Sequence, residues 1–276
     1  MSALRENASS EAGDGDSRLR FGSVAEQYDR ARPGYPEGLI DAAFAYGDIF
    51  PGERALDVGT GTGQLATAVA ARGLEVLGVE PSAAMAEIAN QKFAAAGLEA
   101  HAIVGEFESV ALEPGAFSLI CAGTSWHWLD EDTRFDVAAR AIAPGGTLAV
   151  LWTWPHWRRT GVCAELDAAY ARSGAPLEQM GPMCPLEPDS GALAREWLRH
   201  TQESGVFGDA QGKLCSWSVT YTACGYTDLL GTYADHIGLE PAVRERLFCG
   251  IEQIIDEAGG TIELPYTTLL LLARAA

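Results

Sequence analysis

The stretch that decides the fold is ALDVGTGTGQ at residues 55–64, in which a short apolar run leads into a turn containing three glycines. Residues 54–58 have the composition of a buried strand, and residues 62–72 have the apolar spacing of an amphipathic helix. Glycine lets the backbone approach a ligand closely, and the first turn of a helix offers free N–H groups. The stretch therefore predicts a strand, a ligand-binding turn and a helix in succession.

Strand and helix patterns continue to alternate after this unit. Ser82 is a good N-cap, and Gly97 is a good end, for the helix between them. Such alternation predicts right-handed βαβ units and a parallel sheet, and therefore an α/β fold. The further strands are expected at 74–79, 100–104, 117–122 and 147–152, and the further helices at 36–50 and 131–142.

The alternation stops after residue 154. Residues 155–212 form a long connection, rich in proline and glycine, with helical patterns only at 163–172 and 191–203. A connection of this length is typical of a lid, so we expect 155–212 to be a lid or substrate-binding insertion that covers a site together with 21–35. We then expect a strand at 214–222, helices at 225–238 and 240–258, and a last strand at 261–274.

The polar first 20 residues have no apolar core of a secretory signal, so we expect residues 1–20 to be a disordered tail and the protein to be cytoplasmic. The remainder, 21–276, is expected to be one domain. A formal net charge of −19 disfavours nucleic acid and anionic membranes as partners. The six cysteines show no zinc-type spacing, which predicts free thiols and no metal site.

The glycine-rich turn has two possible ligand classes, and two residues distinguish them. A dinucleotide pattern G-x-G-x-x-G would need glycine where Gln64 stands. Asp57, just before the first glycine, would repel a pyrophosphate but suits a cationic ligand or an amino group. Glu80 stands 17 residues past Gly63 and could accept hydrogen bonds from both hydroxyls of a ribose. A ribose would fit either ligand class, and Glu80 could also be an exposed acid without a ligand. Met85 suits either contact with a base or plain core packing.

The ends of the third and fourth expected strands offer further ligand contacts. Glu106 could accept from an adenine amino group with Phe107 beside the ring, or it could lie in a solvated loop. The fourth strand ends in CAGTSWHW at 121–128, where small residues leave room for a ligand before aromatic residues follow. The tryptophans here and at 152–157 suit either a pocket wall or the core.

Together these residues resemble the class I S-adenosylmethionine-dependent methyltransferases, and within them the trans-aconitate-methyltransferase-like group. The resemblance covers about residues 21–276. It is carried by FGSVAEQY at 21–28 with RPGYP at 32–36, LDVGTGTG at 56–63, GVEPS at 78–82, SWHW at 125–128, IAPGGTLAV at 142–150 and the C-terminal stretch around Tyr233, 254–256 and 264–266.

The resemblance implies a Rossmann-like, three-layer αβα fold with a seven-stranded sheet and a lid inserted between strands five and six. The last strand, 267–274, would run antiparallel between 147–152 and 214–222. The implied cofactor is S-adenosyl-L-methionine. One departure is that Glu106-Phe107 is bulkier than the group's usual Asp or Ser followed by Ala. The cofactor-binding residues implied are Tyr28, Arg32, Asp57, Gly59, Thr60, Gly61, Glu80, Pro81, Met85, Gly105, Glu106, Phe107 and Gly123.

The expected activity is methyl transfer to a small organic molecule by a monomer or homodimer. The tryptophans suggest an apolar or aromatic acceptor, and arginines at 30, 32, 158 and 159 suggest O-methylation of a carboxylate, unless they only offset surface acids. His127 would be the catalytic base for an acceptor that must lose a proton, or would position substrate or make a structural hydrogen bond. The substrate-binding residues expected are Trp126, His127, Trp152, Trp154, His156 and Arg158.

Other functions remain open at this point. A phenol O-methyltransferase, or an N- or C-methyltransferase of a natural-product pathway, would use the same cofactor turn. An NAD-type oxidoreductase is disfavoured by Gln64 and Asp57. A cofactor-binding protein without catalysis is the remaining alternative.

Overall fold

The computed structural model describes residues 21–175 and 189–276. The tail expected at 1–20, and residues 176–188 of the expected insertion, lie outside the described residues. Between residues 37 and 155 the described chain alternates helices and strands as the sequence predicts.

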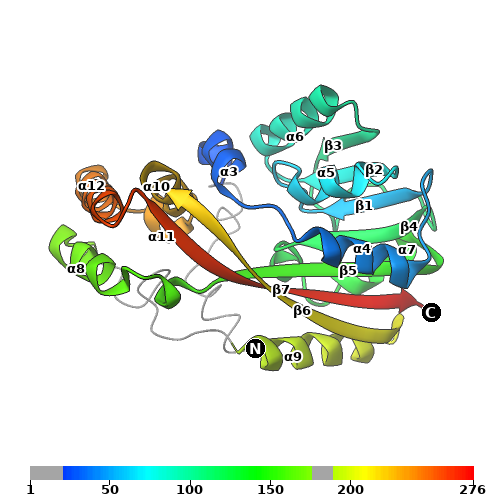
Figure 1. Ribbon diagram of the computed structural model, residues 1–276. Coiled ribbons are helices and arrows are strands. Elements are labelled where there is room, and N and C mark those ends of the chain that lie inside the picture. The colour runs from blue at the N-terminus through cyan, green and yellow to red at the C-terminus, as the bar shows by residue number, and fades with distance from the viewer. Residues whose placement is uncertain (1–20, 176–188) are drawn as a thin grey trace. The chain divides into compact units, whose positions relative to one another are not determined.

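The seven strands form one sheet in the order β3-β2-β1-β4-β5-β7-β6 (Figure 1). The pairs β1–β2, β1–β4, β2–β3 and β4–β5 are parallel, and β7 is antiparallel. The Rossmann-like seven-stranded sheet, with its antiparallel last strand between strands five and six, is thereby confirmed. The strands are β1 Arg54–Val58, β2 Glu75–Glu80, β3 Ala100–Val104, β4 Phe117–Gly123, β5 Ile142–Pro155, β6 Phe207–Thr222 and β7 Thr261–Ala275.

The helices begin and end at the following residues. They are η1 Phe21–Val24, α3 Ala25–Ala31, α4 Glu37–Gly47, α5 Gln64–Ala70, α6 Ala83–Ala96, η2 Trp126–Trp128, α7 Arg134–Ala141, η3 Trp157–Arg159, α8 Cys163–Ser173, α9 Ser190–Glu203, α10 Ala223–Leu230, α11 Ala234–Ile237 and α12 Pro241–Glu257.

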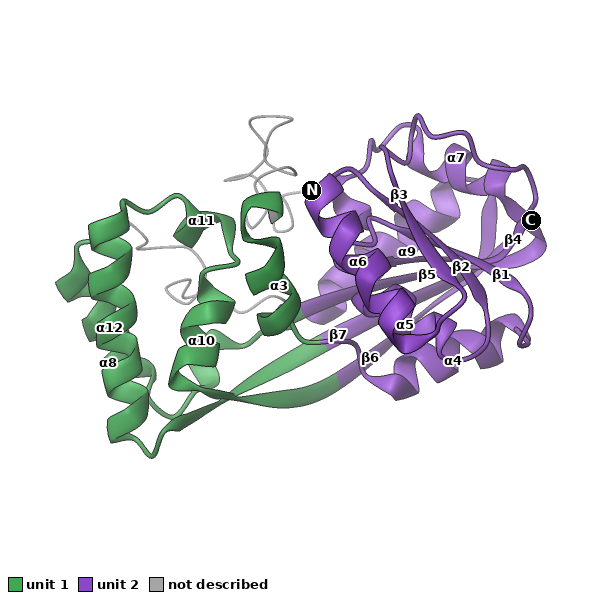
Figure 2. Ribbon diagram, turned by 90° about the horizontal axis from the view of Figure 1, so that it is seen from above, with its two compact units in different colours: residues 1–33, 154–188, 216–267 green, residues 34–153, 189–215, 268–276 purple. Residues whose placement is uncertain are grey.

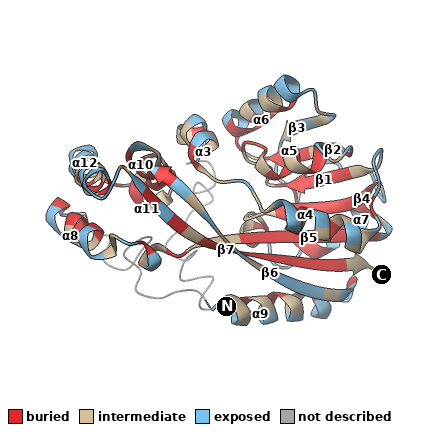
Figure 3. Ribbon diagram, viewed as in Figure 1, coloured by how far each residue is buried: buried red, intermediate tan, exposed pale blue. Residues whose placement is uncertain are grey.

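Helices cover both faces of the sheet. Side chains alternate between the faces along a strand, and one set, including Ala55, Val76 and Leu119, packs with the apolar residues of α4, α5 and α6. On the other face, Trp152 of β5 packs against Trp197 of α9, with ring centroids 4.6 Å apart. The result is the expected helix–sheet–helix layering, and Figure 3 shows the buried residues concentrated along β1, β4, β5 and β7.

Three elements differ most from those expected. β6 begins at Phe207, seven residues before the expected strand, so the expected insertion 155–212 reaches into the sheet. The helix expected at 225–238 is two helices, α10 and α11. β5 extends beyond 147–152 at both ends, because Ile142 pairs with Phe117 of β4 and the strand continues to Pro155.

The described chain divides into two compact units (Figure 2). Of the described residues, unit 1 comprises 21–33, 154–175 and 216–267, and unit 2 comprises 34–153, 189–215 and 268–276. The boundaries at 153/154, 215/216 and 267/268 fall inside β5, β6 and β7. No helix among the described residues is long and apolar enough to cross a membrane.

Candidate functional site

The glycine-rich turn after β1 adopts a backbone that favours glycine. Gly59, Gly61 and Gly63 have φ values of +67°, +56° and +85°, which side chains other than glycine rarely adopt. The N–H groups of Gly59 and Thr60 both donate to the carbonyl of Val79, at 2.9 and 3.1 Å, and thereby fasten the turn to the end of β2. The turn is therefore a fixed cradle at the edge of the sheet where β1 and β2 end.

Asp57 lies beneath this turn and is only 1% exposed. The hydroxyl of Thr60 donates to its carboxylate at 2.6 Å, and the thiol of Cys121 on β4 lies 3.7 Å from the other oxygen. Burial, with a smaller contribution from the nearby Glu80, raises the pKa of Asp57 to about 6, against the effect of these hydrogen bonds. A buried carboxylate with no cationic partner among the described residues suits a positively charged ligand group.

Glu80 ends β2 and is 5% exposed. Its two carboxylate oxygens accept hydrogen bonds from the backbone N–H groups of Gly61 and Ser82, each at 2.9 Å. Burial raises the pKa of Glu80, and the two backbone hydrogen bonds oppose that rise. Each oxygen keeps further acceptor capacity, so a carboxylate held in this way can still accept from a pair of hydroxyls.

The remaining predicted cofactor contacts in unit 2 differ in exposure. Met85 is 4% exposed, and its terminal methyl lies 3.7 Å from the position that a β-carbon on Gly61 would occupy. Pro81 and Gly105 are half-buried, and Gly105 donates to the carbonyl of Glu80 at 3.0 Å. Glu106 is exposed, whereas Phe107 is buried, with its ring 6.2 Å from that of Trp126. The structure therefore gathers the turn, Glu80 and Met85 closely, and leaves Glu106 at the surface.

The end of β4 contains residues that sequence reasoning did not select. Thr124 has φ +55°, which is unusual for a residue with a side chain and often marks a functional strand end. A β-carbon on Gly123 would collide with the ring of Tyr35. A β-carbon on Gly59 would lie 2.5 Å from the β-carbon of Ser125. The phenol of Tyr35 and the hydroxyl of Thr124 are hydrogen-bonded at 3.4 Å. The run of small residues at 121–125 was the available signal for this crowded edge.

The aromatic residues after β4 pack mainly into the protein. Trp126 is 1% exposed, and its ring lies 5.6 Å from Phe135. His127 is half-buried, with its ring 5.2 Å from that of Trp128. Trp152, also 1% exposed, lies in the core against Trp197. Contact of a substrate with either buried indole would require neighbouring side chains to move.

Tyr28 and Arg32, expected to bind the cofactor, belong to unit 1 rather than to the unit of the glycine turn. The Nε–H of Arg32 donates to the hydroxyl of Thr232 at 2.8 Å, and Nη2 donates to the carbonyl of the same residue at 3.1 Å. Its guanidinium carbon lies 3.8 Å from the ring centroid of Tyr233 and 5.0 Å from that of Tyr28. The structure thus places these two residues in a tyrosine cluster of unit 1.

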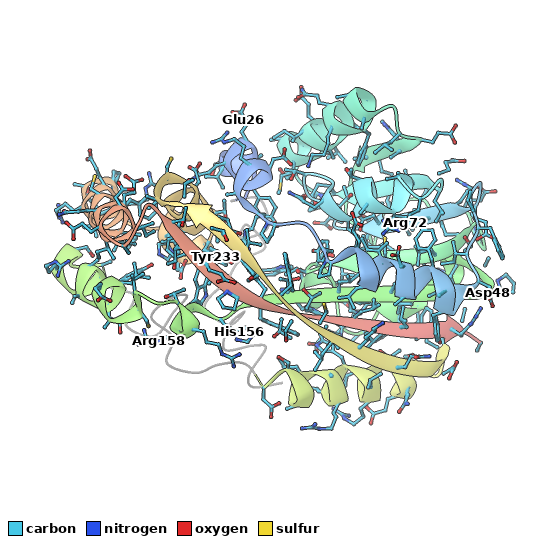
Figure 4. All side chains as sticks on the ribbon, viewed as in Figure 1. Glu26, Asp48, Arg72, His156, Arg158 and Tyr233 are labelled. Atoms are coloured by element: carbon cyan, nitrogen blue, oxygen red, sulfur yellow. The ribbon has the colours of Figure 1, made fainter. Side chains whose placement is uncertain are left out.

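Three expected substrate residues also lie in unit 1, and Figure 4 labels two of them. Trp154 is half-buried. His156 is 5% exposed, with its Nε2 2.7 Å from the hydroxyl of Thr267. Arg158 makes a two-pronged ion pair with Asp167 at 2.5 and 2.8 Å, which raises the pKa of Arg158. Its guanidinium is therefore already neutralised by a residue of its own unit.

Comparison with known proteins agrees with this geometry. Residues 55–146 match a family model described as a methyltransferase domain. An uncharacterised methyltransferase of Mycobacterium tuberculosis is 33% identical over 164 residues, which are 59% of this chain and 63% of that protein. An uncharacterised methyltransferase of Geobacillus kaustophilus is 31% identical over 139 residues, 46% of this chain and 62% of that protein. The matches thus span less than two thirds of these relatives.

Two solved structures share the fold. A putative type II methyltransferase from Anaeromyxobacter dehalogenans has a TM-score of 0.54 and 23% identity, covering 88% of this chain and 97% of that one. The YcgJ protein of Bacillus subtilis also has a TM-score of 0.54, with 17% identity, covering 87% of this chain and 99% of that one. At these identities the likeness establishes the fold alone.

The matched segment, 55–146, contains the glycine turn, Asp57 and Glu80. This segment is similar to methyltransferase domains, a class of enzyme domain.

Proposed function

We propose that the protein transfers a methyl group from S-adenosylmethionine to an oxygen of a small organic acceptor, with a carboxylate as the leading acceptor. The observation that carries the first part is the pair of buried carboxylates, Asp57 and Glu80, on either side of the glycine turn. An NAD-type site would need to hold a pyrophosphate at this turn, and the buried carboxylate of Asp57 would repel it, whereas Glu80 suits a ribose in either class.

The residues present fit S-adenosylmethionine. Asp57, buried without a cationic partner, would attract the positively charged methionyl part, and Gly59 and Gly61 leave room for it. Glu80 would accept from the ribose hydroxyls, with Met85 beside the base. When bound, S-adenosylmethionine supplies an electrophilic methyl group with a neutral leaving group. The protein's own contribution is then to hold the acceptor in line and to exclude water.

The nature of the acceptor determines what else is needed. A carboxylate is ionised at neutral pH and needs no base, whereas a phenol or an ammonium group must lose a proton. His127 is the candidate base for the second case, and it stands two residues after Ser125 at the end of β4. A phenol O-methyltransferase or an N- or C-methyltransferase is therefore the alternative proposal, and membership of the trans-aconitate-methyltransferase-like group stays a prediction.

The test is methyl transfer from radiolabelled S-adenosylmethionine to a panel of aromatic and aliphatic acids, phenols and amines. The proposal expects label in an ester that mild base hydrolyses. A base-stable ether, amine or C-methyl product would support the alternative and refute the carboxylate. Absence of transfer to every member, by a protein that binds S-adenosylhomocysteine, would favour a cofactor-binding protein without catalysis.

A further inference from the structure

Arg32 in unit 1 is a half-buried cation in an acidic protein, and the acceptors of its hydrogen bonds are neutral. The chain has 38 Asp and Glu residues but only 19 Lys and Arg, and many arginines, such as Arg158 and Arg72, are paired with a carboxylate. No carboxylate of the described residues is within ion-pair distance of Arg32. Its hydrogen-bond acceptors are instead the neutral hydroxyl and carbonyl of Thr232.

Thr232 fixes the guanidinium in one orientation. Thr232 is fully buried, and its hydroxyl donates to the carbonyl of Leu229 at 2.7 Å. Because the hydroxyl proton is used in this way, the hydroxyl oxygen of Thr232 accepts from the Nε–H of Arg32. These bonds use two of the five guanidinium N–H donors. The remaining donors, including those of Nη1, keep the planar geometry that binds both oxygens of a carboxylate.

The surroundings of Arg32 are aromatic and carry hydroxyl groups. Its guanidinium lies on the ring of Tyr233, which Figure 4 labels. Burial is the strongest influence on the pKa of Arg32 and lowers it, but nearby phenols, led by Tyr233 and Tyr28, raise the pKa above its ordinary value overall. A cation that is partly removed from water and has no anionic partner is costly, and an anion would relieve that cost.

Two of the neighbouring phenols form a pair that can add a donor. Tyr221 of β6 and Tyr266 of β7 are 8% and 2% exposed, and their hydroxyl oxygens are 2.9 Å apart. One hydroxyl donates to the other, which leaves the second proton for another acceptor. The ring of Trp217 stacks on Tyr266 at 5.1 Å, so the hydroxyl pair is bordered by aromatic surface.

We propose that Arg32, assisted by the hydroxyls of Tyr221 and Tyr266, forms a site in unit 1 that binds a carboxylate of an aromatic or otherwise apolar acceptor. This inference rests on the proposed methyl transfer to such an acceptor. It gives Arg32, rather than the paired Arg158, the role of recognising the acid. The methionyl carboxylate of the cofactor has the same chemistry and is the competing occupant that the experiment must separate.

The experiment is calorimetric titration of the full chain, saturated with S-adenosylhomocysteine, with benzoate and phenylacetate and with their neutral amides. We expect the acids to bind at least tenfold more tightly than the amides. Arg32→Gln should weaken acid binding by roughly ten- to a hundredfold, the range for a lost charged hydrogen bond. Tyr221→Phe, which keeps the ring, should weaken it a few-fold. Arg172→Gln, which removes an exposed charge from α8 of the same unit, should leave it unchanged.

A second pair of titrations separates the occupants. S-adenosylhomocysteine carries the methionyl carboxylate, and methylthioadenosine lacks it. The proposal expects Arg32→Gln to leave both affinities unchanged. A selective loss of S-adenosylhomocysteine binding would overturn the proposal in favour of the cofactor.

Failure of the carboxylate site and failure of the proposed function give different results. Equal acid binding by wild type and a folded Arg32→Gln variant, or no acid binding into the millimolar range, would overturn the site while S-adenosylhomocysteine still binds. Absence of S-adenosylhomocysteine binding by the wild type would instead overturn the proposed function.

Discussion

The hydroxyl of Thr60 donates a 2.6 Å hydrogen bond to the carboxylate of Asp57, and both side chains are buried beneath the glycine turn. The side chain of Thr60 also fills the space above Gly78 of β2, where a β-carbon would lie 2.8 Å from it. The hydrogen bond fixes the carboxylate at the point where β1 and β2 end. Thr60 therefore both packs against the sheet and orients the carboxylate beside the turn.

The first prediction concerns pH. Because burial raises the pKa of Asp57 to about 6, its ionised fraction in the free protein falls as the pH drops through 6. The α-ammonium group of S-adenosylhomocysteine favours the ionised form of Asp57, so affinity for S-adenosylhomocysteine should fall below pH 6 by up to about tenfold per pH unit. Calorimetry from pH 5 to 7.5 measures this. Asp57→Asn should flatten the profile, and an unchanged slope in that variant would remove Asp57 from the effect.

The same carboxylate should reduce stability. The pKa of Asp57 is raised from 3.8 to about 6, so the ionised side chain destabilises the folded state above pH 6. The whole shift corresponds to about 2–3 kcal/mol of unfolding free energy. Its contribution to stability therefore improves as the pH falls from 6 towards 4. Asp57→Asn should have an unfolding free energy at pH 7.5 equal to or above that of wild type, measured in urea. A clear loss of stability would show that the charge is compensated within the fold.

Glu80 gives the third prediction. Glu80→Ala should weaken binding of S-adenosylhomocysteine by about 1.5–3 kcal/mol, the usual loss for hydrogen bonds to a charged group. Glu75→Gln, at the exposed start of the same strand, is the matched control and should leave the affinity unchanged. Equal affinities of all three proteins in calorimetry would exclude Glu80 from the site.

Gly123 gives a prediction about packing. A β-carbon there would collide with the ring of Tyr35, so Gly123→Ala should cost about 1–3 kcal/mol of unfolding free energy. In a Tyr35→Ala background the same substitution should cost much less, because the obstructing ring is absent. Urea unfolding of the four proteins in this cycle gives the coupling. Additive effects would show that the two residues do not touch.

The fifth prediction distinguishes the acceptor classes through His127. With a carboxylate acceptor and saturating S-adenosylmethionine, kcat/KM should be nearly flat from about pH 6 to 8, since no proton is removed. His127→Ala should then mainly raise KM. If a hydroxyl or amine is methylated, activity should instead fall as the pH drops through about 6.5, and His127→Ala should abolish most turnover.

The sequence predicts the order of the elements in residues 37–155 well because its signals there are local. Alternating buried strands and capped helices, such as the one between Ser82 and Gly97, specify both the element and its position. The glycine turn is likewise predictable from neighbouring residues, because its side-chain contacts join residues close in sequence, such as Asp57 and Thr60. These features need no knowledge of distant contacts.

The features that the sequence could not predict depend on distant partners. β6 begins early with the polar stretch FGDAQGK because it is an edge strand with one neighbour, so no apolar alternation marks it. The pairing of Arg158 with Asp167 joins residues nine apart across a turn, and the packing of Trp152 on Trp197 joins β5 to a residue within the expected insertion. Those contacts decide which side chains are available to a ligand, and composition alone does not show them.

The central claim is that the turn around Asp57 and Glu80 binds S-adenosylmethionine. Calorimetric titration of the full chain with S-adenosylhomocysteine and, separately, with NAD tests it most directly. The account predicts saturable binding of S-adenosylhomocysteine, weakened by Glu80→Ala, and no binding of NAD. Tight binding of NAD without binding of S-adenosylhomocysteine would contradict it.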